Sequence, residues 1–293
     1  MSVLLVDANN VAMRSLHAMA RSGLSADGVA TGPLLAFVNA VSKHIREEQP
    51  DRVAVCWDGG RSDYRVDLDE GYKAHRLSMD PEQEDIKGSV FALAKEFCSV
   101  AGLFHIERPG VEADDLIAQY WHEHRPLDEK VVILSSDKDF LQLLVPGQVE
   151  QVRLSSSGTP TDRWTAERVQ QEMGCRPRDI PLAMALAGDV SDNVIGVPRF
   201  GMKTAIKTLG KYDWDLECAL EQDPRLVEHA ERARLNLKLV NLRDGFSGAT
   251  LPALPLFHPT APGGVLWPLL LSFLSKYQMK SVQTRLYEGT LWK

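Results

Sequence analysis

The chain has 293 residues, of which 44% are apolar and 25% are charged, as in an ordinary globular protein. Its four cysteines lie far apart and form no CxxC pair, which argues against a zinc site or a disulfide framework and favours a reducing cytoplasm. The formal net charge of −7, taken alone, argues against a nucleic-acid partner. Asp7 interrupts the apolar run at the N-terminus after four residues, so neither a signal peptide nor a membrane anchor is expected.

Three short apolar stretches are each followed by aspartate. The stretches and their acids are 3–6 with Asp7, 53–57 with Asp58, and 131–134 with Asp137 and Asp139. Helical patterns at 32–47 and 87–101 separate them, which predicts buried parallel strands of an α/β sheet. Ligands of such sheets bind outside the carboxyl ends of the strands, so these acids are expected at one edge. Each Asp alone could equally be a helix N-cap.

A fourth acidic group stands at the start of a predicted helix. The stretch GVEADD, residues 110–115, places Glu112, Asp114 and Asp115 before apolar residues at helical spacing. Acids in a first turn also stabilise a helix through its dipole, by roughly 0.3–1 kcal/mol each, so this stretch alone requires no ligand. A further pair, Asp189 and Asp192, follows the apolar segment 181–187.

Together these nine acids predict a metal centre. Carboxylates that converge in a low-dielectric site repel one another, so a cation must hold them. Oxygen ligands without His or Cys favour Mg²⁺ or Mn²⁺, and two ions about 3.5–4 Å apart are usual for cutting phosphodiesters. Without the nine acids, 31 of the 40 acidic residues remain against 33 Lys and Arg, so the net charge no longer excludes nucleic acid.

Two segments carry candidate phosphate-binding groups. Residues 59–86 include Arg61, Arg65, Lys73 and Arg76, show little apolar periodicity, and are expected to form a long mobile loop near the carboxylates. A solvated polar loop without a function would have the same composition.

The second segment, IGVPRFGMKTAIKTLG at 195–210, predicts a helix–hairpin–helix that grips a DNA backbone without reading bases. Two glycines bracket its turn, and Gly201 is expected to have unusual backbone angles. The helix that follows would present free N–H groups to phosphate. The candidate DNA contacts are Gly196, Gly201, Lys203, Thr204 and Lys207. An ordinary turn between helices is the alternative. Farther on, the apolar stretch 265–274 is too short to span a membrane and predicts a core or docking helix.

The motifs VDANN, WDGG, GVEADD, SSDKD, GDVSDN and GVPRFGMKTA resemble, in order and spacing, the 5′-nuclease family. This family comprises flap endonucleases and 5′→3′ exonucleases, including the N-terminal domain of bacterial DNA polymerase I. The similarity runs from Val3 to about Gly210 and is weaker beyond. Because no polymerase domain follows, the chain resembles a stand-alone form such as bacteriophages encode.

The resemblance implies an α/β fold with a mixed, mainly parallel sheet flanked by helices, a helical arch and a helix–hairpin–helix. Residues 1–175 would form the nuclease core with the arch at 59–86. Residues 176–293 would form the helix–hairpin–helix region and a C-terminal helical part, and the two would pack as one unit.

The resemblance also implies the roles of the site residues. The first metal would be bound by Asp7, Asp58, Glu112 and Asp114, and the second by Asp114, Asp137, Asp139, Asp189 and Asp192, partly through water. Asp115 is included as a metal ligand, although a helical wheel points it away from Asp114, and a purely orienting role is the alternative. Lys73 would contact the scissile phosphate with Arg76 nearby, and Arg14 would touch the DNA end. Met13 replaces the family's usual aromatic, so no stacking role is carried over. The hairpin often binds K⁺ through backbone carbonyls in this family, here between Gly196 and Gly201.

The predicted function is a metal-dependent, structure-specific 5′ nuclease with Lys73, Arg76 and Asp114 as its catalytic residues. It would act as a monomer, away from membranes, in the cytoplasm of a bacterial or phage-infected cell, on DNA with a 5′ flap, a nick or a free 5′ end. One alternative is removal of RNA from RNA–DNA hybrids by the same site. Another is an inactive DNA-junction binding module, which is disfavoured because such a module gains nothing from carboxylates that repel phosphate.

Overall fold

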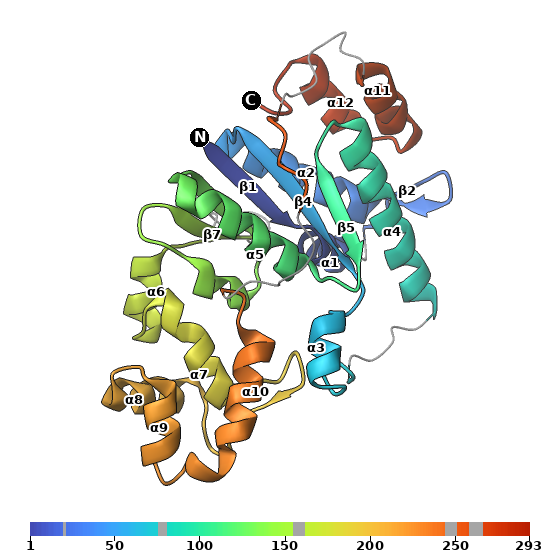
Figure 1. The fold of residues 1–293 in the computed structure, drawn as a ribbon. Coiled ribbons are helices and arrows are strands. Elements are labelled where there is room, and N and C mark those ends of the chain that lie inside the picture. Colours follow the sequence, from blue (N-terminus) through green and yellow to red (C-terminus); the bar gives the residue numbers. More distant parts are fainter. Residues whose placement is uncertain (20–21, 76–80, 155–161, 244–250, 258–265) are drawn as a thin grey trace.

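The computed structural model describes residues 1–19, 22–75, 81–154, 162–243, 251–257 and 266–293 (Figure 1). Its centre is a six-stranded sheet with the strand order β5-β4-β1-β6-β7-β8. The strands are β1 (Ser2–Asp7), β4 (Arg52–Gly59), β5 (His105–Pro109), β6 (Lys130–Leu134), β7 (Val149–Arg153) and β8 (Asp162–Trp164). All neighbours are parallel except β8, which runs antiparallel to β7. The predicted mixed, mainly parallel sheet is confirmed.

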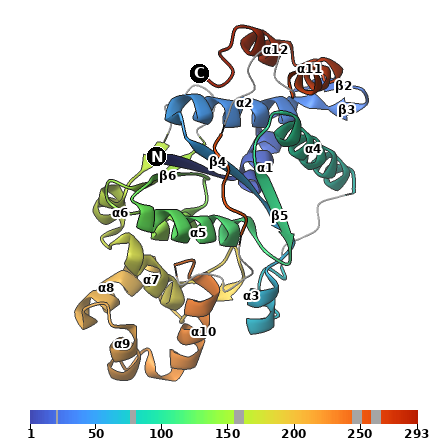
Figure 2. The ribbon, with the colours of Figure 1, turned by 45° about the horizontal axis from the view of Figure 1, so that its top comes forward.

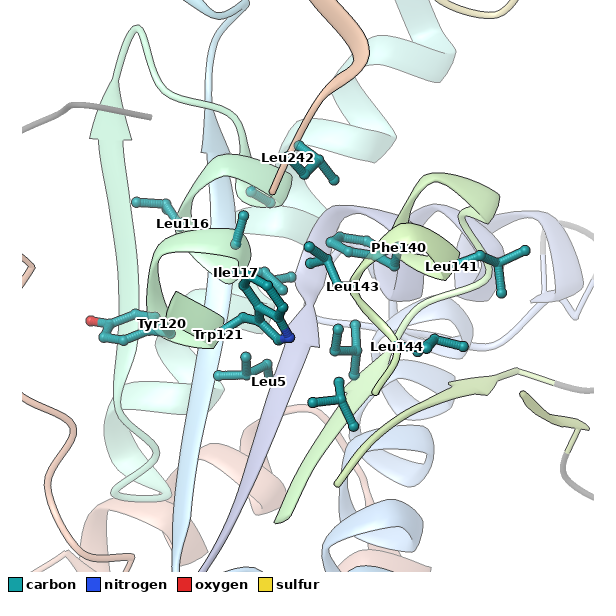
Figure 3. Packing of buried hydrophobic residues seen from close by; sticks show 14 of the residues in the cluster. Leu5, Leu116, Ile117, Tyr120, Trp121, Phe140, Leu141, Leu143, Leu144 and Leu242 are labelled. Atoms are coloured by element: carbon teal, nitrogen blue, oxygen red, sulfur yellow. The ribbon is translucent and has the colours of Figure 1, made fainter. Parts of the chain in front are cut away.

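Helices cover both faces of this sheet, which explains why its central strands read as continuous apolar runs. Along β1, Leu5 packs on one face while Leu4 and Val6 pack on the other. The first face carries α5 (Ala113–His124), with Leu116, Ile117, Tyr120 and Trp121 packed near Leu5 and the segment from Phe140 to Leu144 (Figure 3). A shorter helix, α6 (Ala166–Met173), contributes to the same core.

The second face is covered by α1 (Ala8–Met19), α2 (Thr31–Glu48) and α4 (Pro81–Val100). A small hairpin of β2 (Ser25–Ala26) and β3 (Val29–Ala30) joins α1 to α2. The last two helices are α11 (Trp267–Lys276) and α12 (Lys280–Tyr287). α11 packs on α4, where the ring centroids of Phe273 and Phe97 lie 6.1 Å apart, and α12 packs on α11. The helix predicted from residues 265–274 is therefore confirmed, and it belongs to the core on this face.

A helical part with its own small core lies at the opposite end of the molecule from α11 and α12 (Figure 2). It consists of α7 (Ile180–Ala187), the two-stranded β9 (Gly188–Asp189) and β10 (Val194–Ile195), α8 (Met202–Leu209), α9 (Leu216–Gln222) and α10 (Ala230–Val240). The identification of α7 to α8 as a helix–hairpin–helix remains a prediction. Short 3₁₀ turns complete the chain: η1 (Arg125–Leu127), η2 (Lys138–Leu143), η3 (Pro177–Asp179), η4 (Gly210–Tyr212) and η5 (Val227–His229).

The segment 59–86, expected as a mobile polar loop, is partly folded, so that expectation is wrong for residues 59–75 and for residues 81–86, which begin α4. It forms α3 (Asp63–Leu68) and a turn in which Tyr72 is buried, and Arg65 and Lys73 are buried with it. The reason is that its polar groups pair with buried acids, which apolar periodicity does not register. Arg76 and the rest of 76–80 lie outside the described residues, so the complete helical arch remains a prediction. Within the described residues, no helix is long and apolar enough to cross a membrane.

Candidate metal centre

A cavity of about 820 Å³ opens at the carboxyl ends of β1, β4 and β6. Six of the residues predicted from the sequence line it: Asp7, Asp58, Lys73, Glu112, Asp114 and Asp137. The register places Asp7 beside Cys56 on β4, two residues before Asp58, so parallel pairing brings these strand ends to one edge. Asp115, Asp139, Asp189 and Asp192 do not line the cavity itself.

Asp7 and Asp58 are held by residues that directly follow β1 and β6. Oδ2 of Asp7 accepts a hydrogen bond from Oγ of Ser135 at 2.7 Å, and Oδ1 accepts one from the N–H of Asn10. Nδ2 of Asn9 donates to Oδ2 of Asp58 at 2.7 Å. Burial, together with the negative charge of Asp58, raises the pKa of Asp7 to about 7. Burial also raises the pKa of Asp58 to about 6. A nearby divalent cation would favour the charged form of both.

The start of α5 directs Glu112 towards neighbouring donors instead of its own helix. Gly110 turns the chain with φ +70°, a conformation that favours glycine. Glu112 is the N-cap, yet its side chain makes no capping hydrogen bond. Its Oε1 instead accepts from Nζ of Lys73 at 2.7 Å, and its Oε2 accepts from Tyr72 Oη at 2.8 Å and from Arg65 Nη1 at 2.9 Å.

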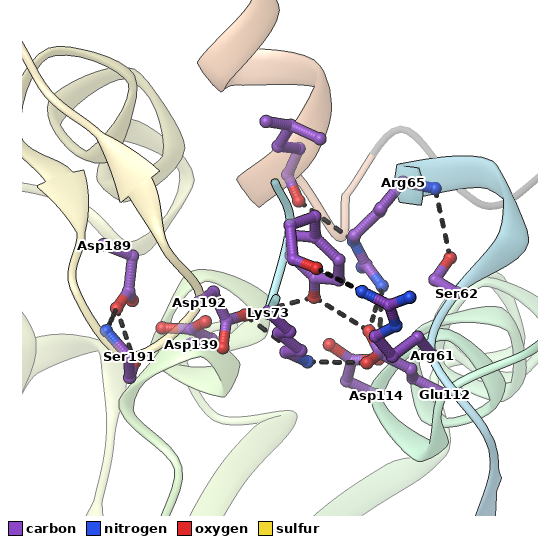
Figure 4. Close-up of polar contacts among 12 residues, drawn as sticks. Arg61, Ser62, Arg65, Lys73, Glu112, Asp114, Asp139, Asp189, Ser191 and Asp192 are labelled. Carbon is purple, nitrogen blue, oxygen red and sulfur yellow. Dashed lines mark hydrogen bonds and ion pairs between the residues drawn. The ribbon is translucent and has the colours of Figure 1, made fainter. Parts of the chain in front are cut away.

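Arg65 binds the acids of this helix start from the buried side (Figure 4). Burial alone would lower the pKa of Arg65, but Asp114, Asp115 and Glu112 hold it above its usual value. Asp115 receives two hydrogen bonds from the guanidinium. Burial and the charge of Asp114 raise the pKa of Asp115 to about 7. Glu112, Asp114 and Asp115 can each offer an oxygen within 4.8 Å of the others, so a metal could bind this trio.

The remaining acids form a second group beside the cavity. Burial and the charges of Asp137, Asp189 and Asp192 raise the pKa of Asp139 well above its usual value. Among the described residues, no donor reaches Oδ1 of this buried carboxyl. Asp189 is paired with Lys138 at 3.3 Å, and Asp192 accepts from Tyr72 at 3.1 Å. Lys73 lies between the two groups, 3.4 Å from Oδ2 of Asp192 (Figure 4). A buried carboxylate oxygen without a donor among mutually repelling acids fits a site for hard cations.

Of the residues predicted to contact DNA, Lys73 lines this cavity, whereas Arg14 and the residues of α8 do not. Nη2 of Arg14 donates to the carbonyl of Leu154 at 2.9 Å, and the neighbouring Met13 lines the cavity. Lys203, Thr204 and Lys207 lie on α8, with both lysines exposed.

The backbone of the predicted hairpin differs from expectation at one glycine. Gly201 caps α8 with φ −91° and ψ 170°, so the expected unusual conformation at this glycine is wrong. The left-handed residue of the loop is Arg199, with φ +65°. Gly196 lies close to the backbone at the end of α7. A Cβ at this position would lie 2.2 Å from the carbonyl oxygen of Ala187.

Several residues that shape the site were missed as site residues by the motif analysis. Asn9, Asn10 and Ser135 fix Asp7 and Asp58, and Tyr72 and Arg65 fix Glu112. Gln151, which is fully buried on β7, donates to the carbonyls of Ser135 and Asp137 and so fixes the turn that carries Asp137. The two asparagines of VDANN gave a signal in the sequence, since polar amides directly after a buried strand need partners. Gln151 gave none, because it follows Glu150 and so shows no alternation with apolar residues.

Comparison with known proteins gives one family. Residues 2–174 match the family described as 5′-3′ exonuclease, N-terminal resolvase-like domain. A 5′-3′ exonuclease of Aquifex aeolicus is 32% identical over 243 residues, which are 81% of this chain and 80% of that protein. DNA polymerase I of Mycobacterium tuberculosis is 32% identical over 212 residues. That match covers 72% of this chain but 23% of the polymerase, so the chain spans about a quarter of the length of such relatives.

Solved structures share the fold at low sequence identity. The T5 5′-exonuclease with bound divalent zinc ions superposes with a TM-score of 0.71 at 18% identity, covering 94% of this chain and all of that one. The catalytic core of Rad2 in complex with DNA substrate gives a TM-score of 0.57 at 15% identity, covering 97% of this chain and 91% of that one. These similarities support the arrangement of sheet and helices described above.

Proposed function

The chain belongs to the 5′-3′ exonuclease family, and from this premise we propose that it is a structure-specific 5′ nuclease that hydrolyses DNA phosphodiesters with two divalent cations. The family predicted from the motifs is confirmed by this match. The observation that carries the proposal is the single cavity in which acids from two strand ends, the turn after β6 and the start of α5 converge. Its substrates would be DNA with a 5′ flap, a nick or a free 5′ end, bound by a monomer.

The described acids supply enough oxygens for two ions of Mg²⁺ or Mn²⁺. Asp7, Asp58, Glu112 and Asp114 would hold the first, and Asp114, Asp137, Asp139, Asp189 and Asp192 would hold the second. When bound, such a pair supplies an activated water and stabilises the leaving oxygen of an in-line displacement. The raised pKa values of Asp7 and Asp58 support this, because burial disfavours the charged form of both carboxylates and a bound cation would favour it.

Lys73 would neutralise the charge that develops on the scissile phosphate. Its ammonium lies on the cavity wall between Glu112 and Asp192. A phosphate bound to the metal ions of the acidic site would lie within its reach. Arg76 would assist it, Arg14 would contact the DNA end, and α8 would present its N-terminus and two lysines to the duplex backbone. The loop from Gly196 to Gly201 is the proposed place for K⁺.

One assay tests the proposal. Cleavage of a 5′-flap DNA is measured with Mg²⁺ and again with EDTA, for the parent and for Asp7→Asn and Asp137→Asn. We expect the parent to cut only with Mg²⁺, and both variants to lose cleavage while still binding DNA, because each removes a metal ligand and a repulsive charge. Near-normal turnover in both variants would contradict the two-metal assignment. An RNA–DNA hybrid in the same assay measures the alternative substrate.

A further inference from the structure

We infer that Arg65 is a positioning residue that fixes the carboxylate of Glu112 and ties it to α10, with Asp115 serving as its counter-ion. The inference rests on the proposed function, since Glu112 matters here as a metal ligand. It assigns Asp115 a role other than metal binding, and it gives α3 a part in building the metal centre.

The guanidinium of Arg65 forms a fork, meaning that its N–H groups bind two carboxylates at once. Nη1 donates to Oε2 of Glu112 and to Oδ2 of Asp115, both at 2.9 Å, and Nη2 donates to Oδ1 of Asp115 at 2.8 Å. Only 4% of the Arg65 side chain is exposed. A bidentate contact between guanidinium and carboxylate is planar and directional, so Asp115 fixes the plane of the fork and the fork then fixes Glu112.

The two carboxylate oxygens of Glu112 have different kinds of hydrogen-bond partner, so one is fixed and the other can exchange its partner. Oε2 is shared by Arg65 and by Tyr72, whose ring also lies beneath the guanidinium at 5.6 Å. Oε1 accepts from Nζ of Lys73, which is carried on a flexible four-carbon stem. Arg65 therefore orients the carboxylate while leaving Oε1 towards the cavity that Lys73 and Glu112 both line. Both oxygens of Asp115, in contrast, are directed at Arg65.

A third contact extends the fork to α10. Nε of Arg65 donates at 2.9 Å to the carbonyl of Leu239, in the last turn of that helix, where carbonyls lack partners within the helix. Earlier on α10, Nδ2 of Asn236 donates at 2.9 Å to the carbonyls of Ala185 and Ile195, in the part proposed to grip DNA. Arg65 thus links the proposed metal ligand to the helix that supports the proposed hairpin.

The test must separate geometry from charge. Removing the cation would by itself make the acidic site more attractive to metal, whereas losing the fork should misplace Glu112. Arg65→Lys keeps the charge but cannot reach two oxygens of Asp115, one of Glu112 and the Leu239 carbonyl together. Loss of a side chain that orients a metal ligand typically weakens metal binding by 10–100-fold.

The experiment titrates Mn²⁺ into the full-length chain without DNA, by calorimetry, after folding is checked by circular dichroism. We expect Arg65→Lys and Asp115→Asn each to weaken Mn²⁺ binding by about tenfold or more. The double variant should be no weaker than the worse single variant, because both changes break one unit. Arg52→Lys is the matched control. Arg52 forms an ion pair with Glu129 at 2.9 Å near the other ends of the strands, and its variant should keep the parent's affinity.

The outcomes separate this inference from the proposed function. If the parent binds no Mn²⁺ and cuts no DNA, the proposed function fails. If the parent binds and Arg65→Lys binds equally well, the positioning role is wrong. Full additivity of the two single changes would make Asp115 an independent ligand and would also overturn the inference. Should Arg65→Lys not fold, Arg65→Gln replaces it. Because this change also removes a cation that repels metal, weaker Mn²⁺ binding would support the positioning role, and equal or tighter binding would overturn it.

Discussion

Lys73 illustrates how the acids of this site fix the position and the charge of a single residue. Its backbone is left-handed, with φ +52°, and its N–H donates to the carbonyl of Asp192 at 2.9 Å. Burial alone would lower the pKa of its ammonium, but Asp114, Asp192 and Glu112 outweigh burial and raise it. The side chain therefore stays charged at neutral pH, which a group that neutralises phosphate requires.

Lys73→Ala should slow the chemical step much more than it weakens DNA binding. A cation on the scissile phosphate acts most strongly in the transition state, so we expect a loss of about 10²–10³ in the single-turnover rate and only a few-fold loss in affinity. Lys87→Ala is the control, because Lys87 lines the same cavity but is paired with Glu84 on α4. A preserved single-turnover rate with reduced affinity would make Lys73 only a phosphate anchor.

At the scale of elements, the segment from α7 to α8 depends on one of its two glycines and not on the other. Gly196 lies against the end of α7, whereas Gly201 has ordinary extended angles and open space where a Cβ would stand. The sequence predicted the turn but could not show which of the two glycines the fold requires, because close backbone approach is a property of the folded chain. A glycine is informative only when its neighbours in space are known.

Gly196→Ala should therefore destabilise the protein, and Gly201→Ala should not. The new Cβ at position 196 would lie 2.2 Å from the carbonyl oxygen of Ala187, which forces α7 and the hairpin apart. At position 201 it would contact nothing within 4 Å. Thermal unfolding of both variants measures the difference, and we expect a lower Tm for Gly196→Ala alone. Equal melting temperatures would contradict the close packing of α7 against the loop.

Lys203→Ala should weaken DNA binding without affecting the chemistry. Lys203 is exposed in the first turn of α8, outside the metal cavity, so its loss should reduce the slope of log K against log[salt] by roughly one unit. The single-turnover rate at saturating enzyme should stay within about tenfold of the parent. Lys280→Ala, on α12 at the other end of the molecule, should leave both quantities unchanged. An unchanged slope with a collapsed rate would place Lys203 in the active site.

At the scale of the whole molecule, the sequence revealed the parts of the fold that are apolar and missed those that are polar. β1, β4 and β6 were predictable because they are buried on both faces, and the position of their acids followed from parallel pairing. The edge strand β5, with the sequence HIERP, and the short β8 lack apolar runs and were not predicted. The buried contacts of Arg65 and Tyr72 could not be predicted, because a polar segment looks solvated until its partners are known.

Burial of the acids, together with their mutual repulsion, also makes the stability of the whole molecule depend on pH and on metal. The pKa of Asp7 and that of Asp115 are raised to about 7 in the folded chain, and that of Asp58 to about 6, against 3.8 for an ordinary Asp. Each folded carboxyl holds its proton more tightly than the unfolded one, so the free energy of unfolding falls as pH rises from about 4 to about 7. Buried His44 and half-buried His105, whose pKa values are lowered, act in the opposite direction, but only up to their ordinary value of about 6.5.

The window from pH 6.5 to 8 therefore isolates the acids, and in EDTA we expect the Tm to fall by a few degrees across it. Divalent cations bind the ionised carboxylates of the folded chain, so Mn²⁺ should raise the Tm more at pH 8 than at pH 6.5. Asp7→Asn is the matched variant, because its amide oxygen can still accept from the N–H of Asn10, its NH2 can donate to Oγ of Ser135, and it has no carboxyl proton to lose. In EDTA at pH 8 it should melt higher than the parent, and its Tm should depend less on pH. A parent Tm that rises from pH 6.5 to 8 in EDTA would show that cations are not needed to keep these acids together.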